Sequence, residues 1–217
     1  MKDYKYIIFD LDGTLSDSKE GITKCVQYAL KKVGIIEENL SDLEYFVGPP
    51  MVEQYMKSYG MSEEKAYETL GYYRERYTPI GIYETKAYPG VKEILEAVKN
   101  NGMKIGMATS KPQDMAVEVA KYLEIFDYFD VIRGADLHGP RQSKEEVLKK
   151  VFEDTDFDPE ESILVGDTRY DVEGANKVGI DCIGVTWGTG TKEEMLDEGA
   201  IETFDDYESV IKFFVGE

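Results

Sequence analysis

The chain has 217 residues, 42% of them hydrophobic, which is enough to bury the core of one large domain or of a core with a smaller insertion. Its 25 Lys and Arg residues stand against 44 Asp and Glu residues, so the formal net charge is −19. Such a surface repels nucleic acid polymers and anionic membranes, and we expect neither as a partner. An anionic ligand would need a local cation to offset this field.

The first predicted element is a strand. The apolar run Tyr6–Phe9 is followed at once by Asp10-Leu11-Asp12-Gly13-Thr14. An apolar run bounded by turn residues is typical of a strand buried on both faces in a parallel sheet. The two acids therefore lie where the strand ends, which is where open α/β sheets bind ligands. We predict that Asp10 is a nucleophile and Asp12 its acid/base partner in the removal of phosphate from a small molecule.

Residues 16–83 show helical spacing and no convincing strand. Four helices are expected, over residues 22–33, 40–45, 52–59 and 63–77, with Ser62 as the cap of the last. The stretch Gly48-Pro49-Pro50 interrupts them and is a candidate substrate-facing loop. Nine of the sixteen tyrosines of the chain lie in this region, and at helical spacing they are mainly expected to pack, although some could face a substrate.

From Tyr88 onward, helical and strand patterns alternate. The strand patterns lie at residues 103–108, 128–133, 162–165 and 182–185, with a short edge strand near Phe204. Such alternation predicts an α/β fold, a parallel sheet flanked by helices. We therefore expect a core domain over residues 1–15 and 84–217 and an all-helical cap domain over residues 16–83.

Further polar residues follow the later strands or begin helices of this core, namely Thr109, Lys144, Asp167 and Asp171. Because parallel strands point their carboxyl ends to one edge of the sheet, these residues can converge on Asp10 and Asp12. Mg²⁺ held by Asp10 and Asp167 would offset the repulsion between an attacking carboxylate and phosphoryl oxygens. Lys144 would add a fixed positive charge, and Thr109 would hydrogen-bond the transferred group.

Four segments of the chain resemble, in order, the motifs of the haloacid dehalogenase superfamily: Asp10–Thr14, Thr109, Lys144 and Gly166–Asp171. The resemblance covers the chain from Tyr6 to about Gly190. It implies a Rossmann-like sheet with strand order 5-4-1-2-3, a helical cap and an aspartyl-phosphate intermediate on Asp10.

The resemblance also implies roles for individual residues. Asp10 would be nucleophile and Mg²⁺ ligand, and Asp12 would be acid/base with its backbone carbonyl on the metal. Asp167 would be a further metal ligand, while Asp171 would bind the metal through water or orient Lys144. Thr109, Ser110 and Lys144 would bind the phosphoryl group.

Four basic residues are candidates to contact a second anionic group of the substrate: Lys111, Arg141, Arg74 and Arg76. For each of them, a solvated place on the surface is the simpler interpretation.

Within the superfamily, Tyr88-Pro89-Gly90, Thr109–Pro112 and Val185–Gly188 resemble phosphoglycolate phosphatases. The stretch Arg141–Val147 lacks the proline that those enzymes often have after the lysine, and it resembles 5′-nucleotidase-like phosphatases. We therefore expect a Mg²⁺-dependent phosphatase of a small phosphorylated metabolite. A phosphomutase and a phospho-accepting regulatory domain are the alternatives, and a dehalogenase is disfavoured because it would leave Asp12 and a metal at Asp167 without a purpose.

The remaining features concern the compartment. Cys25 and Cys182 match no metal or redox spacing and are expected to be reduced and buried. The N-terminus leads directly into a strand, so no signal peptide is expected, and no apolar run approaches the roughly 20 residues of a membrane span. We expect a soluble, cytoplasmic protein that is a monomer or a weak homodimer.

Overall fold

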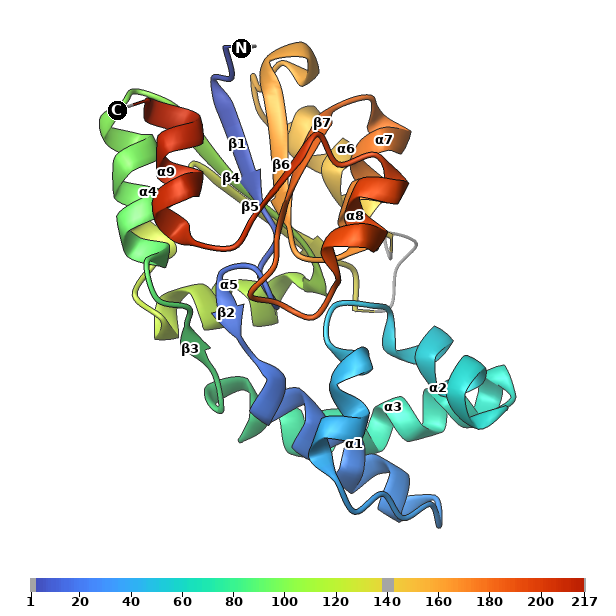
Figure 1. The fold of residues 1–217 in the computed structure, drawn as a ribbon. Helices are drawn as coiled ribbons and strands as arrows, with labels where there is room; N and C mark the ends of the chain where they lie inside the picture. The colour runs from blue at the N-terminus through green and yellow to red at the C-terminus, as the bar shows by residue number, and fades with distance from the viewer. Residues whose placement is uncertain (1–2, 138–142, 217) are drawn as a thin grey trace.

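The computed structural model describes residues 3–137 and 143–216 of the chain. Its centre is a parallel sheet of six strands in the order β5-β4-β1-β6-β7-β8 (Figure 1). The strands are β1 (Tyr6–Phe9), β4 (Lys104–Pro112), β5 (Val131–Ala135), β6 (Ser162–Gly166), β7 (Asp181–Val185) and β8 (Glu202–Phe204). Counting core strands alone, the order from β7 to β5 is 5-4-1-2-3, which confirms the expected topology; β8 adds the edge strand expected near Phe204.

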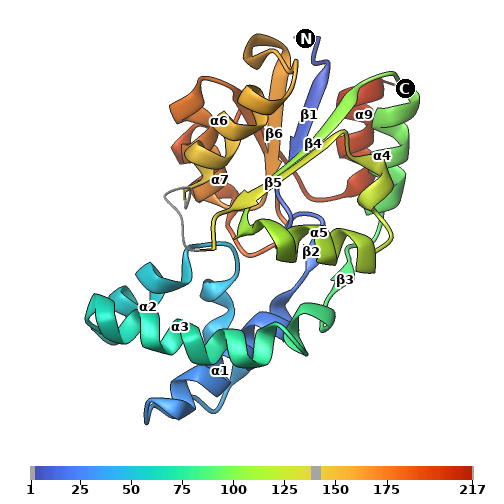
Figure 2. The same cartoon turned by 180° about the vertical axis from the view of Figure 1, so that it is seen from behind.

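Helices cover both faces of the sheet, with α4 and α9 on one side and α6 and α7 on the other (Figure 2). They are α4 (Val91–Asn100), α5 (Gln113–Tyr122), α6 (Lys144–Asp154), α7 (Arg169–Val178), α8 (Lys192–Glu198) and α9 (Tyr207–Val215). Alternate residues of β1 serve the two faces: Ile7 and Phe9 belong to the apolar cluster with α4 and α9, and Ile8 to the one with α6 and α7. The strand is apolar throughout because both faces are buried.

The register of the three central strands positions the site. Phe9, the last residue of β1, lies beside Met107 of β4 and Val165 of β6. Residues that follow these positions therefore lie at the same edge of the sheet, as predicted for Asp10, Thr109 and the loop after β6.

A helical layer lies beyond this edge (Figure 1). It consists of α1 (Lys19–Lys32), a 3₁₀ helix at Leu40–Phe46, α2 (Met51–Tyr59), α3 (Glu63–Tyr77) and a 3₁₀ turn at Gly81–Tyr83. Helix α3 has the expected bounds, and Ser62 caps it by accepting a hydrogen bond from the Lys65 amide. Phe46 and Tyr55 are fully buried inside the layer. The division into a core domain (1–15 and 84–217) and a cap domain (16–83) stays a prediction.

Two very short strands join the layers. β2 (Ser16–Asp17) pairs antiparallel with β3 (Lys86–Ala87). The expectation of no strand between Leu15 and Tyr83 is therefore wrong at β2, because a strand of two residues is too short to show an alternating pattern. Within the described part of the chain, no helix has the length and apolar character needed to cross a membrane.

Candidate active site

Asp10 extends β1 by one backbone hydrogen bond, since its amide donates to the Val165 carbonyl over 2.9 Å. The chain then turns sharply at Gly13, whose φ is 90°. A side chain there would be strained and would also collide with Asp167, because an added Cβ would lie 2.2 Å from Asp167 Oδ2. The glycine of the first motif therefore lets β1 end directly beside a residue that follows β6.

Lys144 connects three parts of the core. Its ammonium lies 2.7 Å from Asp10 Oδ1 and 2.8 Å from Asp171 Oδ1, and it donates to the Ala108 carbonyl over 2.8 Å. The side chain is buried and starts from the first residue of α6, where Ser143 and Glu146 form a capping box. The lysine predicted as an electrostatic partner of Asp10 is thus in contact with it.

Asp167 is fully buried and receives hydrogen bonds from both sides. Oδ1 accepts from Thr14 Oγ1 over 3.2 Å, and Oδ2 accepts from the amide and the hydroxyl of Thr189 over 2.9 and 3.2 Å. Gly188 makes room for this carboxylate, because a Cβ at that position would lie 2.1 Å from Oδ2. Burial, aided by the charges of Asp171 and Asp10, raises the pKa of Asp167 to about 8.

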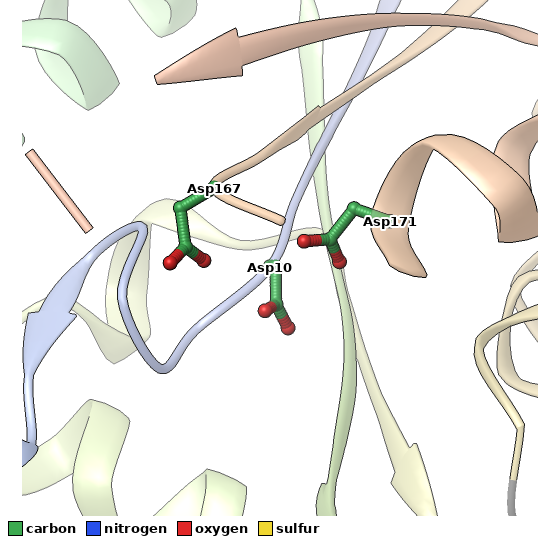
Figure 3. A group of neighbouring side chains, drawn as sticks. All are labelled: Asp10, Asp167 and Asp171. Atoms are coloured by element: carbon green, nitrogen blue, oxygen red, sulfur yellow. The ribbon is translucent and has the colours of Figure 1, made fainter. Parts of the chain in front are cut away.

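Three buried acids fit a metal ion. Asp10, Asp167 and Asp171 each offer one oxygen, and these oxygens lie within 4.8 Å of one another (Figure 3). Asp10 Oδ1 is in ionic contact with Lys144 but has no well-directed hydrogen bond, which leaves it able to bind a cation. Burial raises the pKa of Asp10 to about 6, although Lys144 opposes this shift. One ammonium cannot neutralise three carboxylates, and a hard divalent cation such as Mg²⁺ suits an all-oxygen site.

Asp171 also has a structural partner. Its Oδ2 accepts hydrogen bonds from the amide and hydroxyl of Thr168, which forms a capping box at the start of α7. Its other oxygen holds Lys144. This arrangement is compatible with both roles suggested for Asp171, orientation of the lysine and binding of a metal through water.

Asp12 points toward a different set of partners. Its Oδ2 lies 2.8 Å from Lys111 Nζ, and its Oδ1 accepts a hydrogen bond from Ser16 Oγ over 3.3 Å. Lys111 also donates to the hydroxyl of Tyr77 in α3 over 2.6 Å. Burial disfavours the ammonium, but Asp12 and Tyr77 outweigh that cost and raise the pKa of Lys111. The simpler interpretation of Lys111 as a solvated lysine is wrong, because only 8% of it is exposed.

The other predicted residues have different outcomes. Thr109 is buried in β4, two residues beyond Met107, and its Oγ1 accepts a hydrogen bond from the Lys111 amide over 3.2 Å. Ser110 lines the cavity beside Asp12. Arg76 is paired with Glu84 at 2.7 Å. Arg141 lies outside the described residues.

A cavity of about 340 Å³ opens between the helical layer and the core, next to Asp12. Gly48, Pro49 and Pro50, the candidate substrate-facing loop, line it. Lys111 and Arg74 line it as well, so two of the four basic candidates lie where a bound molecule could contact them.

A family model for haloacid dehalogenase-like hydrolases matches residues 7–185. The chain belongs to the haloacid dehalogenase-like hydrolases. This confirms the resemblance carried by the four motifs. Over 192 residues, 88% of this chain and 87% of the relative, the chain is 41% identical to a 5′-nucleotidase of Pseudomonas aeruginosa.

Two further similarities agree with this family. A phosphoglycolate phosphatase of Aquifex aeolicus is 28% identical over 187 residues, 85% of each chain. The crystal structure of a predicted phosphatase from Clostridium acetobutylicum matches with a TM-score of 0.96 and 38% identity over the whole of both chains.

Three residues of this hydrolase's site were not predicted from the sequence. The Thr189 amide donates a hydrogen bond to Asp167, Gly188 leaves room for the Asp167 carboxylate, and the Tyr77 hydroxyl accepts a hydrogen bond from Lys111. Thr189 and Gly188 follow the strand that ends at Val185, so their place after a buried strand was an available signal. Nothing in the sequence separates Tyr77 from the other tyrosines of the helical region, because its role arises from a partner 34 residues away.

Proposed function

We propose that this hydrolase is a Mg²⁺-dependent phosphatase that cleaves a small phosphomonoester through an aspartyl-phosphate on Asp10. The observation that carries the proposal is the buried group at the end of β1, where Asp10 lies 2.7 Å from Lys144 and beside Asp167 and Asp171. Lys144 and a bound Mg²⁺ would together offset the repulsion between the Asp10 carboxylate and the phosphoryl oxygens. The family of the chain supports the same chemistry.

The first step transfers the phosphoryl group to the protein. A carboxylate oxygen of Asp10 attacks phosphorus, and the bond from phosphorus to the leaving oxygen breaks. Asp12 donates a proton to that oxygen, so the product departs as an alcohol. Lys144 stays beside Asp10, and we assign Thr109 and Ser110 to the oxygens of the transferred group.

The second step returns Asp10 to its original state. Asp12 accepts a proton from a water molecule, the water oxygen attacks phosphorus, and the bond between phosphorus and Asp10 breaks. Inorganic phosphate leaves and the Asp10 carboxylate is regenerated. Lys111, 2.8 Å from Asp12, keeps the acid/base group oriented throughout.

A small phosphorylated metabolite in the cytoplasm is our proposed substrate. The relatives named 5′-nucleotidase and phosphoglycolate phosphatase support this size class. A phosphomutase or a phospho-accepting regulatory domain would use the same aspartate, but only a phosphatase releases phosphate over many turnovers without an acceptor.

The test measures release of phosphate from an aryl phosphate with Mg²⁺ or with a chelator. We expect turnover only with Mg²⁺, no turnover in Asp10→Asn, and a phosphorylated protein in rapidly quenched reactions of the wild type. Asp12→Asn should lower the rate by roughly 10²–10⁴-fold. Normal turnover by Asp10→Asn would disprove the mechanism.

A further inference from the structure

The cavity beside Asp12 follows one side of helix α3. The residues of α3 that line it form a helical stripe: Glu63, Tyr67, Leu70, Tyr73, Arg74 and Tyr77. Their backbone positions extend over about 21 Å at the usual rise of 1.5 Å per residue. Tyr77 marks the end nearest the chemistry, because its hydroxyl binds the lysine that pairs with Asp12. A leaving group of two carbons would reach only this end.

The walls of the cavity are mainly apolar and aromatic. Thioether and ring side chains from both layers line it, including Phe46, Met51, Met56, Tyr67 and Met115. Tyr73 and Tyr77 stack with ring centroids 5.1 Å apart and planes at 14°. Flat aromatic surfaces favour planar rings, and methionine side chains adapt to their shape.

The two cations of the cavity differ in their availability. Lys111 is already in contact with Asp12 and Tyr77. Arg74 lies about one helical turn before Tyr77, is half-buried, and donates to the Leu137 carbonyl over 3.4 Å. Within residues 3–137 and 143–216, no carboxylate is ion-paired with Arg74. Its guanidinium therefore has donors left for a ligand, at a distance from the acid/base group.

Acidic residues restrict what those donors would bind. Glu53 and Glu63 also line the cavity. A leaving group with a second negative charge would be repelled by them. A carboxylate two carbons from the phosphate would in addition face Asp12, whose lysine is already committed. A neutral ring with a carbonyl or ring-nitrogen acceptor avoids both costs.

We propose that this cavity selects phosphomonoesters whose leaving alcohol carries a neutral planar ring, which lies between the methionine and tyrosine walls and accepts a hydrogen bond from Arg74. The proposal rests on the phosphatase function proposed above and names its substrate class. Phosphates of small carboxylic acids, such as phosphoglycolate, are then poor substrates.

The experiment compares kcat/KM for three phosphomonoesters that differ in the leaving group: phosphoglycolate, ribose 5-phosphate and uridine 5′-monophosphate. We expect the ring-bearing substrate to exceed ribose 5-phosphate by at least about 10-fold, the effect of one hydrogen bond from a charged donor. Arg74→Met should remove most of this advantage through KM and leave ribose 5-phosphate within about two-fold. Lys65→Met, on the exposed side of the same helix, is the matched control.

The outcomes separate this inference from the proposed function. Equal kcat/KM for ribose 5-phosphate and uridine 5′-monophosphate, or an equal loss for all substrates in Arg74→Met, would overturn the ring selection while the phosphatase function stands. No Mg²⁺-dependent turnover of any ester, aryl phosphate included, would overturn the phosphatase function. In that case, calorimetry with uridine alone still tests whether the cavity binds the ring. Weaker uridine binding by Arg74→Met than by the wild type supports ring binding in this cavity, and no uridine binding by the wild type refutes it.

Discussion

Replacing Asp167 by asparagine should stabilise the metal-free protein as the pH rises. The carboxyl group is fully buried, and burial with two neighbouring acids raises its pKa to about 8. Its oxygens accept hydrogen bonds only from the amide of Thr189 and from the hydroxyls of Thr14 and Thr189 among the described residues. An amide oxygen can replace Oδ2, and the Thr14 hydroxyl can rotate to accept from the amide nitrogen.

The size of the effect follows from proton linkage. The ordinary pKa of the group is 3.8, so between about pH 4 and pH 8 the folded state keeps a proton that the unfolded state has lost. The free energy of unfolding therefore falls as the pH rises, by up to about 1.4 kcal/mol per pH unit. The side-chain amide of the Asp167→Asn variant does not titrate, so its stability lacks this pH dependence. From pH 6 to pH 7.5 the variant should gain about 2 kcal/mol relative to wild type, or roughly 4–8 °C in melting temperature.

The assay is thermal or urea unfolding of both proteins with a chelator at pH 6 and pH 7.5. The control is Asp197→Asn, which replaces an exposed acid on α8 and should be as stable as the wild type at both pH values. Adding Mg²⁺ at pH 7.5 should raise the stability of the wild type and leave the stability of Asp167→Asn nearly unchanged. Parallel pH dependence of the two proteins, or a variant less stable than wild type at pH 7.5, would refute the reasoning.

Three further outcomes are expected. Mg²⁺ should bind more weakly at pH 5.5 than at pH 7.5 and release protons on binding, because Asp10 and Asp167 have raised pKa values. Calorimetry in buffers of different ionisation enthalpy measures the number of protons released. A Mg²⁺ affinity that does not change with pH would contradict the prediction. Gly188→Ala should lower Mg²⁺ affinity at least about 10-fold, since its Cβ would collide with Asp167, whereas Gly71→Ala, at a glycine of α3 in open space, should leave titrations of Mg²⁺ unchanged. Lys144→Met should abolish turnover and lower the free energy of unfolding in urea by about 3–5 kcal/mol, because it leaves buried carboxylates unpaired. An unchanged midpoint of urea unfolding would argue against the burial of these carboxylates.

The parallel sheet and the main acids of the site were predictable from local patterns, whereas the strand order came from the family resemblance. The apolar run before Asp10 and the alternation after Tyr88 specify a parallel sheet, whose strands end at one edge. That geometry brings Asp10 and Asp167 together across more than 150 residues. The capping box at Ser143 likewise placed Lys144 at the first position of its helix, since capping depends on residues only three apart.

Other features depend on contacts between layers and left no local trace. Lys111 looked like a surface lysine, but the fold buries it between Asp12 and Tyr77 of the helical layer. The stripe of α3 that lines the cavity has the spacing of an ordinary packing face, so only its position over the sheet edge distinguishes it. Periodicity reports which side of a helix is covered, and it does not report whether protein or a ligand covers it. For the same reason the motifs indicate phosphate chemistry at Asp10, whereas the choice of leaving group depends on how the helical layer sits over Asp12.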